Sequence, residues 1–251
     1  MYTCELKQRT VALLAAAALG IATMMIGGPA TGTGLPVDAM TIRGNPGVIP
    51  NVGPRYAELT EQWWRWAFSF PAASLPFLNT GGPVDISAGQ PNLGVWFLAG
   101  DDGAHKVARA GVVPPGVQLF FPMANLVNDY PCPDPSFAPP PGESLEHFLQ
   151  RTGVDVIYPQ TGLFAEIDGV SLGNLSSYFV VSPIFTFTAD PALAETFDPC
   201  ITGTTQPGVS VGYWLLLAPL NPGVHVLHFG SHSWGQDVTY VLYVTPLGHG
   251  R

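Results

Sequence analysis

Three histidines close to the C-terminal end of the chain are the first candidates for a metal site. His225, His228 and His232 follow one another closely, and Asp237 comes shortly after them. Successive side chains of a strand point to opposite faces, so a spacing of three separates His225 from His228. Metal ligands must converge on one ion. We therefore predict structural histidines near a sheet edge, with no metal and no cofactor. The alternative is a metal held by His228, His232 and Asp237 across a loop.

A pair of carboxylates in the middle of the chain is the candidate for acid–base chemistry. Glu166 and Asp168 are two residues apart, so in a strand they share a face. The tripeptide Glu166-Ile-Asp168 resembles the core motif of the secreted jelly-roll glucanases, which implies a catalytic role for Glu166. Retaining hydrolysis needs two carboxyls about 5–5.5 Å apart. Where that family's motif continues to its second glutamate, this chain has residues 169–172 (GVSL), which contain no carboxylate. Asp168 is better explained as a turn residue.

Ser210 lies in a G-x-S-x-G pattern formed by residues 208–212. A nucleophile elbow needs a strand before the serine and a helix after it. Here Pro207 precedes the pattern and an apolar run follows it, so Ser210 is predicted to begin a strand. We expect no hydrolase of this type.

The composition favours an all-β domain with ordered loops. The 251 residues include 29 Gly and 26 Pro, and only 11% are charged. Residues 209–244 read as three successive strands, with a turn at residues 221–223 (NPG) and a polar loop before residue 238. We predict a jelly-roll-like β-sandwich of nine or ten strands with one Trp-rich N-terminal helix and a short inserted helix.

Further elements follow from periodicity. Residues 93–98 and 178–188 read as strands, and residues 105–113 and 117–123 as a hairpin through PPG. Residues 162–173 form a hairpin whose Asp-Gly pair suits a type I′ turn. Residues 56–70 have apolar side chains at helical spacing, and we expect Trp63, Trp64 and Trp66 to pack in the core and not to form a sugar-stacking platform. A short helix over residues 144–152 is predicted to end at Gly153.

The N-terminal residues 1–30 have the features of a signal peptide. Lys7 and Arg9 precede an apolar run, and small residues lead to a cleavage position after Ala30. The alternative is an uncleaved anchor. Residues 31–54 form a Gly/Pro-rich spacer with at best an edge strand near residues 40–43, and residues 55–251 a single β-sandwich domain. We expect this body to be soluble and extracytoplasmic, either periplasmic or extracellular.

The charge of the body excludes some partners. Removing residues 1–30 leaves 7 Lys+Arg and 17 Asp+Glu, a net charge of −10. We therefore expect no basic surface of the kind that binds nucleic acid or anionic membranes. A carbohydrate or a cell-surface protein is the expected kind of partner.

The cysteines predict one disulfide. Cys4 belongs to the signal, which leaves Cys132 and Cys200, 68 residues apart. An even pair in an exported protein reads as a bridge, and a loop of this length implies about 4 kcal/mol of stabilisation. A reactive or metal-bound thiol pair is the alternative.

Several phrases of the sequence resemble an uncharacterised family of exported bacterial β-sandwich proteins. They are EQWWRWAFSFP at residues 61–71, GVWFLAG at 94–100, VPPGVQLFFP at 113–122, EIDG at 166–169 and GYWLLLAPLNPGVHVLHFG at 212–230. The resemblance implies that the protein is exported and that it has a β-sandwich fold. It does not point to a particular activity.

Together these features predict an exported β-sandwich that acts as a binding or surface module and not primarily as an enzyme. The expected binding surface lies where loops gather, with His232 and Trp234 on one loop and Asp101 and Arg109 on another. A carbohydrate-active enzyme that uses Glu166 is the alternative function, and a metal-dependent site at His228 and His232 is the third.

Overall fold

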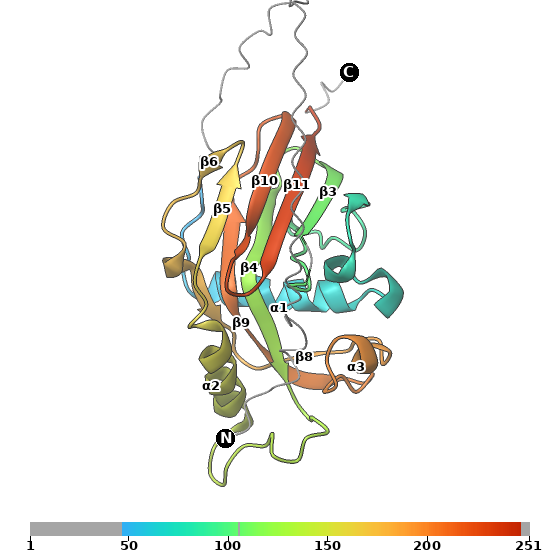
Figure 1. Cartoon of the computed structure of the whole chain (residues 1–251), viewed down its shortest axis with the longest axis vertical. Coiled ribbons are helices and arrows are strands. Elements are labelled where there is room, and N and C mark those ends of the chain that lie inside the picture. The colour runs from blue at the N-terminus through green and yellow to red at the C-terminus, as the bar shows by residue number, and fades with distance from the viewer. Residues whose placement is uncertain (1–46, 105, 247–251) are drawn as a thin grey trace, which may run out of the picture. The chain divides into compact units, whose positions relative to one another are not determined.

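Two β-sheets packed face to face form the centre of the computed structural model, which describes residues 47–104 and 106–246 (Figure 1). These residues belong to one compact unit, Asn45–Arg251. The predicted signal peptide and the edge strand expected near residues 40–43 lie outside the described residues.

The first sheet has six strands and the second has five. In spatial order, the six-stranded sheet contains β1 (Gly82–Pro83), β3 (Lys106–Val113), β11 (Gln236–Val244), β10 (Gly223–Ser231), β5 (Leu163–Ile167) and β6 (Val170–Ser171). The five-stranded sheet contains β2 (Val95–Phe97), β4 (Gln118–Asp129), β9 (Gln206–Leu217) and β7 (Phe179–Val181), with β8 (Phe185–Phe187) also paired to β9. The helices are α1 (Pro54–Phe68), α2 (Leu145–Ile157) and α3 (Leu193–Thr196).

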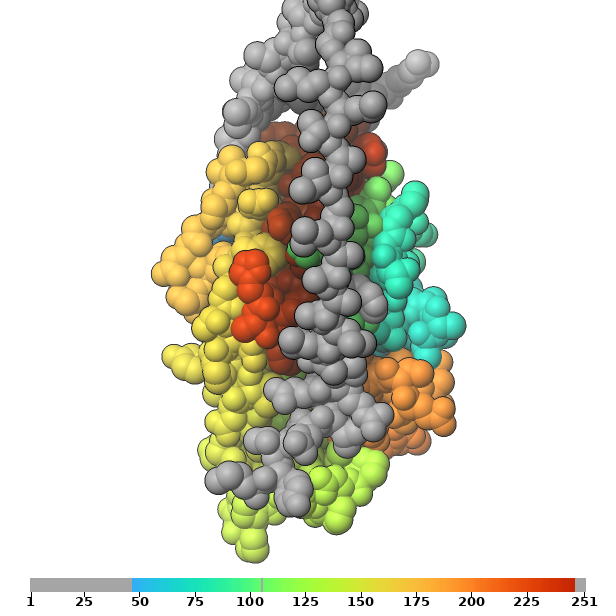
Figure 2. Space-filling model, viewed as in Figure 1, coloured from blue at the N-terminus to red at the C-terminus, as the bar shows by residue number. Residues whose placement is uncertain are grey.

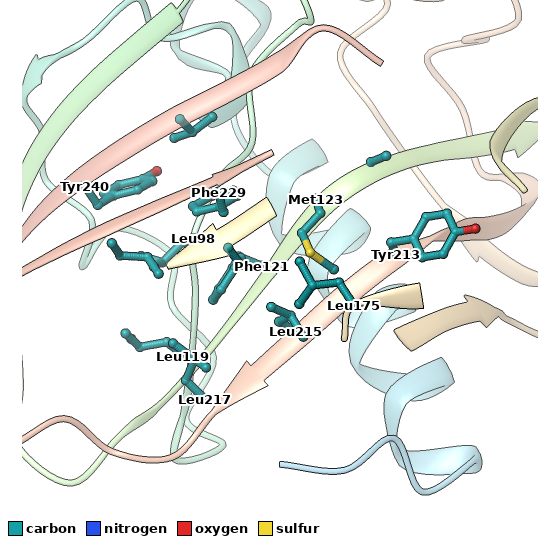
Figure 3. Packing of buried hydrophobic residues seen from close by; sticks show 14 of the residues in the cluster. Leu98, Leu119, Phe121, Met123, Leu175, Tyr213, Leu215, Leu217, Phe229 and Tyr240 are labelled. Atoms are coloured by element: carbon teal, nitrogen blue, oxygen red, sulfur yellow. The ribbon is translucent and has the colours of Figure 1, made fainter. Parts of the chain in front are cut away.

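The main core lies between the two sheets. From β4, Leu119 and Phe121 point into it, and from the facing sheet Phe229 and Tyr240 do the same (Figure 3). Phe121 and Phe229 meet with their ring centroids 4.4 Å apart. The period of two along each strand supplies this apolar face. The predicted all-β sandwich is confirmed.

A second core lies on the other face of the five-stranded sheet, where α1 packs. Trp63 and Trp64 of α1 contact each other, and Trp63 also contacts Trp214 of β9, which stacks on Phe120 of β4 with ring centroids 5.2 Å apart. Both faces of β4 and β9 are therefore buried, which explains their nearly continuous apolar sequences. Trp63, Trp64 and Trp66 are at most 8% exposed, which confirms the prediction that they pack in the core.

Helix α2 is longer than predicted. Ser144 caps its start, with Oγ accepting a hydrogen bond from the backbone N–H of His147 at 3.2 Å, but the helix continues through Gly153 to Ile157. The prediction that Gly153 ends the helix is wrong. Gly153 is buried against β9, and a Cβ placed there would come within 2.8 Å of Val211 Cγ2. Close packing, and not a helix end, explains this glycine.

The predicted hairpin of residues 105–113 and 117–123 is also wrong. Strand β3 pairs in parallel with β11 in one sheet, whereas β4 pairs with β9 in the other. The intervening Pro114-Pro115-Gly116 segment carries the chain from sheet to sheet. A proline has no N–H to donate to a ladder, so this segment does not continue the pairing of either strand. The single strand predicted over residues 178–188 is also wrong. The segment forms two strands, β7 and β8, which Pro183 separates and which both pair with β9.

The hairpin predicted over residues 162–173 is confirmed. Strands β5 and β6 join through Asp168 and Gly169, whose φ angles of 52° and 77° suit a type I′ turn. The last two strands predicted within residues 209–244 are β10 and β11, and they pair with each other in antiparallel register from Gly223↔Val244 to Ser231↔Gln236.

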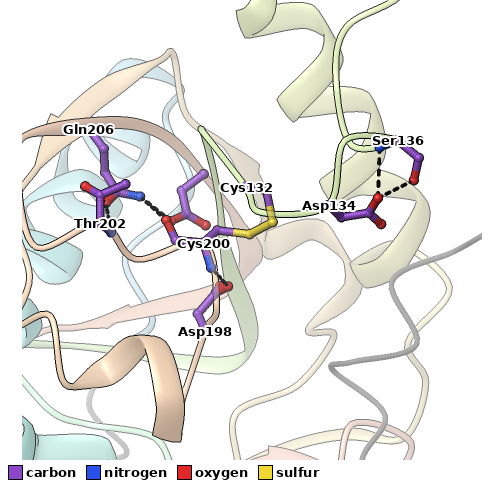
Figure 4. Close-up of a disulfide and its surroundings, with 8 residues drawn as sticks. Cys132, Asp134, Ser136, Asp198, Cys200, Thr202 and Gln206 are labelled. Atoms are coloured by element: carbon purple, nitrogen blue, oxygen red, sulfur yellow. Dashed lines mark hydrogen bonds between the residues drawn. A yellow bond between two sulfur atoms is a disulfide. The ribbon is translucent and has the colours of Figure 1, made fainter.

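The predicted disulfide joins Cys132, after β4, to Cys200, before β9 (Figure 4). Gln206 organises the surrounding loop, because its Nε2 donates to Asp129 Oδ2 at 2.6 Å and to the Cys200 carbonyl at 2.9 Å. Asp198 Oδ1 accepts the backbone N–H of Cys200 at 3.1 Å. The bridge therefore ties together the ends of two neighbouring strands.

Among the described residues, no helix has the length and apolar character that crossing a membrane requires.

Candidate functional site

The outer face of the six-stranded sheet, which points away from the second sheet, carries three of the predicted site residues: Glu166, His228 and Asp237. Helices α1 and α2 pack on strands of the other sheet, and in Figure 1 the strands β3, β11, β10 and β5 lie nearest the viewer. The burial pattern of these strands alternates, so every second side chain reaches this face.

The register arranges the outer face in rows across the strands. One end of the face is apolar and the other is polar. The apolar rows are Val112–Tyr243–Val224 and Ala110–Val241–Val226, and the polar rows are Ala108–Thr239–His228–Glu166 and Lys106–Asp237–Gly230–Phe164. The side chains of neighbouring strands therefore meet although they are far apart in the sequence.

The polar rows hold a connected group of charges, here called the His228 cluster: Glu166, His228, Asp237 and Lys106. His228 Nδ1 lies 3.3 Å from Glu166 Oε1, and His228 Nε2 lies 2.9 Å from Asp237 Oδ1. Lys106 Nζ lies 2.8 Å from Asp237 Oδ2. The imidazole thus stands between two carboxylates, one on each neighbouring strand.

Asp237 is the central anion of the His228 cluster. Partial burial on its own would raise the pKa of this carboxyl, but hydrogen bonds and charge from Lys106 and His228 outweigh that effect and lower the pKa. The same contact raises the pKa of Lys106. Asp237 therefore remains ionised at neutral pH, and it holds Lys106 and His228 on the outer face.

The apolar rows leave large side chains in contact with solvent. Val112 is 56% exposed, Val224 49%, Tyr243 47% and Val226 42%. Scattered exposed apolar residues are ordinary, but these four occupy neighbouring register positions on three adjacent strands. The outer face thus combines a contiguous apolar area with a charged border.

Glu166 has an environment that differs from a glycosidase site. Its side chain is 46% exposed on the sheet, and its neighbour is the imidazole of His228. Asp168 instead accepts hydrogen bonds from the backbone N–H of Val226 at 2.8 Å and lies 2.7 Å from His225 Nδ1. The Asp168 carboxylate is thus engaged in contacts beside the turn that this residue forms, as expected. Glu166 instead lies on an open sheet surface.

The candidate metal ligands are only partly brought together. His228 and Asp237 touch, but the ring of His232 packs on Phe164 with centroids 5.0 Å apart. Within the described chain, the one group of three His, Cys, Asp or Glu side chains with ligand atoms within 4.8 Å of one another is Asp129, Asp198 and Cys200. The sulfur of Cys200 belongs to the disulfide, so it is no thiolate ligand.

The two predicted binding loops meet each other. Asp101 Oδ2 accepts the backbone N–H of Asp237 at 2.8 Å, and its Oδ1 accepts that of Gly103 at 2.7 Å. Gly235 approaches Gly103 so closely that a Cβ on Gly235 would lie 2.5 Å from the Gly103 carbonyl oxygen. Burial raises the pKa of Asp101, and these N–H donors oppose the rise. Trp234, in the same turn, is half-buried.

Arg109 lies in strand β3 and not on a loop, and it is 2% exposed. Its side chain points inward, away from the outer face, to a cavity at the edge of the sandwich. The alternation of β3 puts position 109 on the same face as Val107 and Val113, where an apolar residue is expected. A charged residue at such a position gave no sign that it would be buried.

Ser210 is fully buried within β9. Its backbone N–H donates to Ser182 Oγ at 2.9 Å, and its Oγ accepts from Trp64 Nε1 at 3.2 Å. No helix follows it, which agrees with the prediction that this serine is not at a nucleophile elbow.

The fold and the outer face define a two-sheet β-sandwich with one open, mixed apolar and charged sheet surface. No family model, no curated protein and no solved structure matches this chain.

Proposed function

We propose that this protein is exported and works as a binding module that docks a protein partner on the outer face of its six-stranded sheet. The single observation behind the proposal is the contiguous apolar area of Val112, Val224, Val226 and Tyr243, bordered by the His228 cluster. An apolar centre with a polar border is the usual anatomy of a protein interface.

The charge of the chain favours a particular partner. A net charge of −10 after residue 30 opposes association of two copies, because both would carry the same charge. Glu166 and Asp237 stand beside the apolar area, so a neutral or basic protein surface complements it. A sugar ligand is less well supported, since sugar-stacking platforms use exposed aromatic rings, and among the residues that the structure describes Tyr243 is the one exposed aromatic ring on this face.

Export is supported by the apolar N-terminal segment and by the Cys132–Cys200 bridge, because disulfides persist in oxidising compartments. The intact mass of protein exported by a bacterial host tests it. We expect a chain that starts after Ala30 and is two hydrogens lighter than its reduced form.

The docking proposal is tested by placing a photo-cross-linking residue at Val226 in cells that naturally produce the protein. We expect one discrete protein adduct, and none from the same residue at Tyr158, which is 63% exposed on another element. The purified partner should bind the double variant V226E/Y243E at least tenfold more weakly than the wild type, since such interfaces depend on a few central residues.

Three results would overturn this proposal: equal adducts from both positions, unchanged affinity of the double variant, or binding of a polysaccharide instead of a protein. The enzyme alternative has its own signature. Activity on a glycan that disappears in E166Q would assign Glu166 a catalytic role in place of a docking role.

A further inference from the structure

A cavity of about 300 Å³ lies at the edge of the sandwich, separate from the outer face. The end of α1, the segment that follows it, β2, β3 and β11 all contribute to its wall. Trp66, Phe70 and Phe97 provide an aromatic side, and Arg109 and Tyr240 a polar one. The segment that follows α1 and contributes to this wall belongs to the teal region at the side of the molecule in the space-filling view (Figure 2).

Arg109 is the charged group of this cavity. Its Nη1 donates to the carbonyls of Ala99 at 3.1 Å and Gly100 at 2.8 Å, and to Tyr240 Oη at 3.0 Å. Its Nη2 donates to the Asn79 carbonyl at 2.8 Å, whereas its buried Nε has no hydrogen-bond partner.

The four hydrogen-bond acceptors of Arg109 are all neutral oxygens. The carboxylate that feels its charge is Asp101: burial raises the pKa of that carboxyl, and Arg109 lowers it only as the weakest of several effects. A buried charge without a directly hydrogen-bonded counterion is costly, and so is a buried donor without an acceptor. An anion in the cavity would relieve both.

The walls restrict the class of anion. The aromatic side suits an apolar or aromatic body, and the volume lies at the lower end of the range for small-molecule sites. Asp85 at the wall is exposed, and its Oδ1 accepts the backbone N–H of Ser87 at 3.0 Å. Its negative charge disfavours a doubly charged group more strongly than a singly charged one.

We infer that this cavity binds a small monocarboxylate with an apolar or aromatic body, whose carboxylate pairs with Arg109. The site is independent of the proposed docking face, because no residue of the His228 cluster lines it. Guanidinium and carboxylate form strong charge-assisted hydrogen bonds, and the aromatic side chains would cover the body of the ligand.

The test uses the whole chain and phenylacetate as the probe, with its neutral amide as the matched control ligand. Binding is followed by the fluorescence of the tryptophans, since Trp66 lines the cavity, and by NMR of the labelled protein. We expect a Kd below about 1 mM for the acid, as its size permits. The amide should bind at least tenfold more weakly, and phenyl phosphate should also bind more weakly than the acid.

A blocking variant avoids disturbing the contacts of Arg109. Ser74 is exposed at the cavity wall, so S74W should fill the space and weaken binding at least tenfold. The matched control is S177W, because Ser177 is also an exposed serine in a 3-10 turn but is remote from the cavity. Equal binding of acid and amide, no binding of either, or an S74W variant that binds normally would each overturn the inference.

Discussion

Asp237 is the residue at which the charges of the outer face meet. Its lowered folded-state pKa stabilises the fold above the unfolded value of about 3.9, and this stability is lost as pH falls through the folded value. We expect D237N to lose about 0.5–1 kcal/mol of unfolding free energy at pH 7, because the contact with Lys106 is largely solvent-screened. Urea unfolding at pH 7 and near pH 3 should show the difference shrinking at the lower pH.

The control for this substitution is D155N, on the exposed side of α2. It should change the unfolding free energy little at either pH. A D237N effect that persisted unchanged near pH 3 would mean that the side chain acts by its shape and not by its charge.

At the scale of elements, α2 depends on a close approach at Gly153. We expect G153V to destabilise the protein by about 1–3 kcal/mol, because the added atoms have no space beside Val211. Helix propensity alone would predict a small gain, since valine is a better helix residue than glycine. The midpoint of urea unfolding measures the outcome.

The comparison variant is D155V, which places the same side chain on the exposed side of the same helix. It should cost about 0.5 kcal/mol or less, as surface substitutions usually do. Equal losses in the two variants would show that Gly153 is not packed as tightly as the structure indicates.

At the scale of the whole molecule, β4 and β9 belong to both hydrophobic cores. Their inward residues contact the facing sheet, and Phe120 and Trp214 contact the α1 layer. We expect one cooperative transition, so tryptophan fluorescence, which reports mainly on the α1 layer, and far-UV circular dichroism should give the same urea midpoint.

W214F sharpens this prediction, because the indole Nε1 of Trp214 has no hydrogen-bond partner to lose. It should lower both midpoints by the same amount, because the packing that is lost outweighs the relief of one unpaired buried donor. A fluorescence transition that precedes the circular dichroism transition would show that the α1 layer unfolds separately from the sandwich.

The sequence by itself determined the elements whose signals are local. The alternating apolar residues of β10 and β11, the Asp168-Gly169 turn, the tryptophan-bearing face of α1 and the disulfide pair were all predictable, because each depends on neighbouring residues or on a single pair of cysteines. The candidate residues Glu166, His228 and Asp237 were also identifiable by type.

Only the tertiary structure decided how these pieces meet. Glu166, His228, Asp237 and Lys106 become neighbours because β5, β10, β11 and β3 are adjacent in one register, and pairing between distant strands has no local signal. The parallel placement of β3 beside β11 also put Arg109 next to the buried Tyr240 on the inner face. For the same reason the hairpin predicted around Pro114 was wrong, and Gly153 became a packing position whose demand comes from Val211, far away in the sequence.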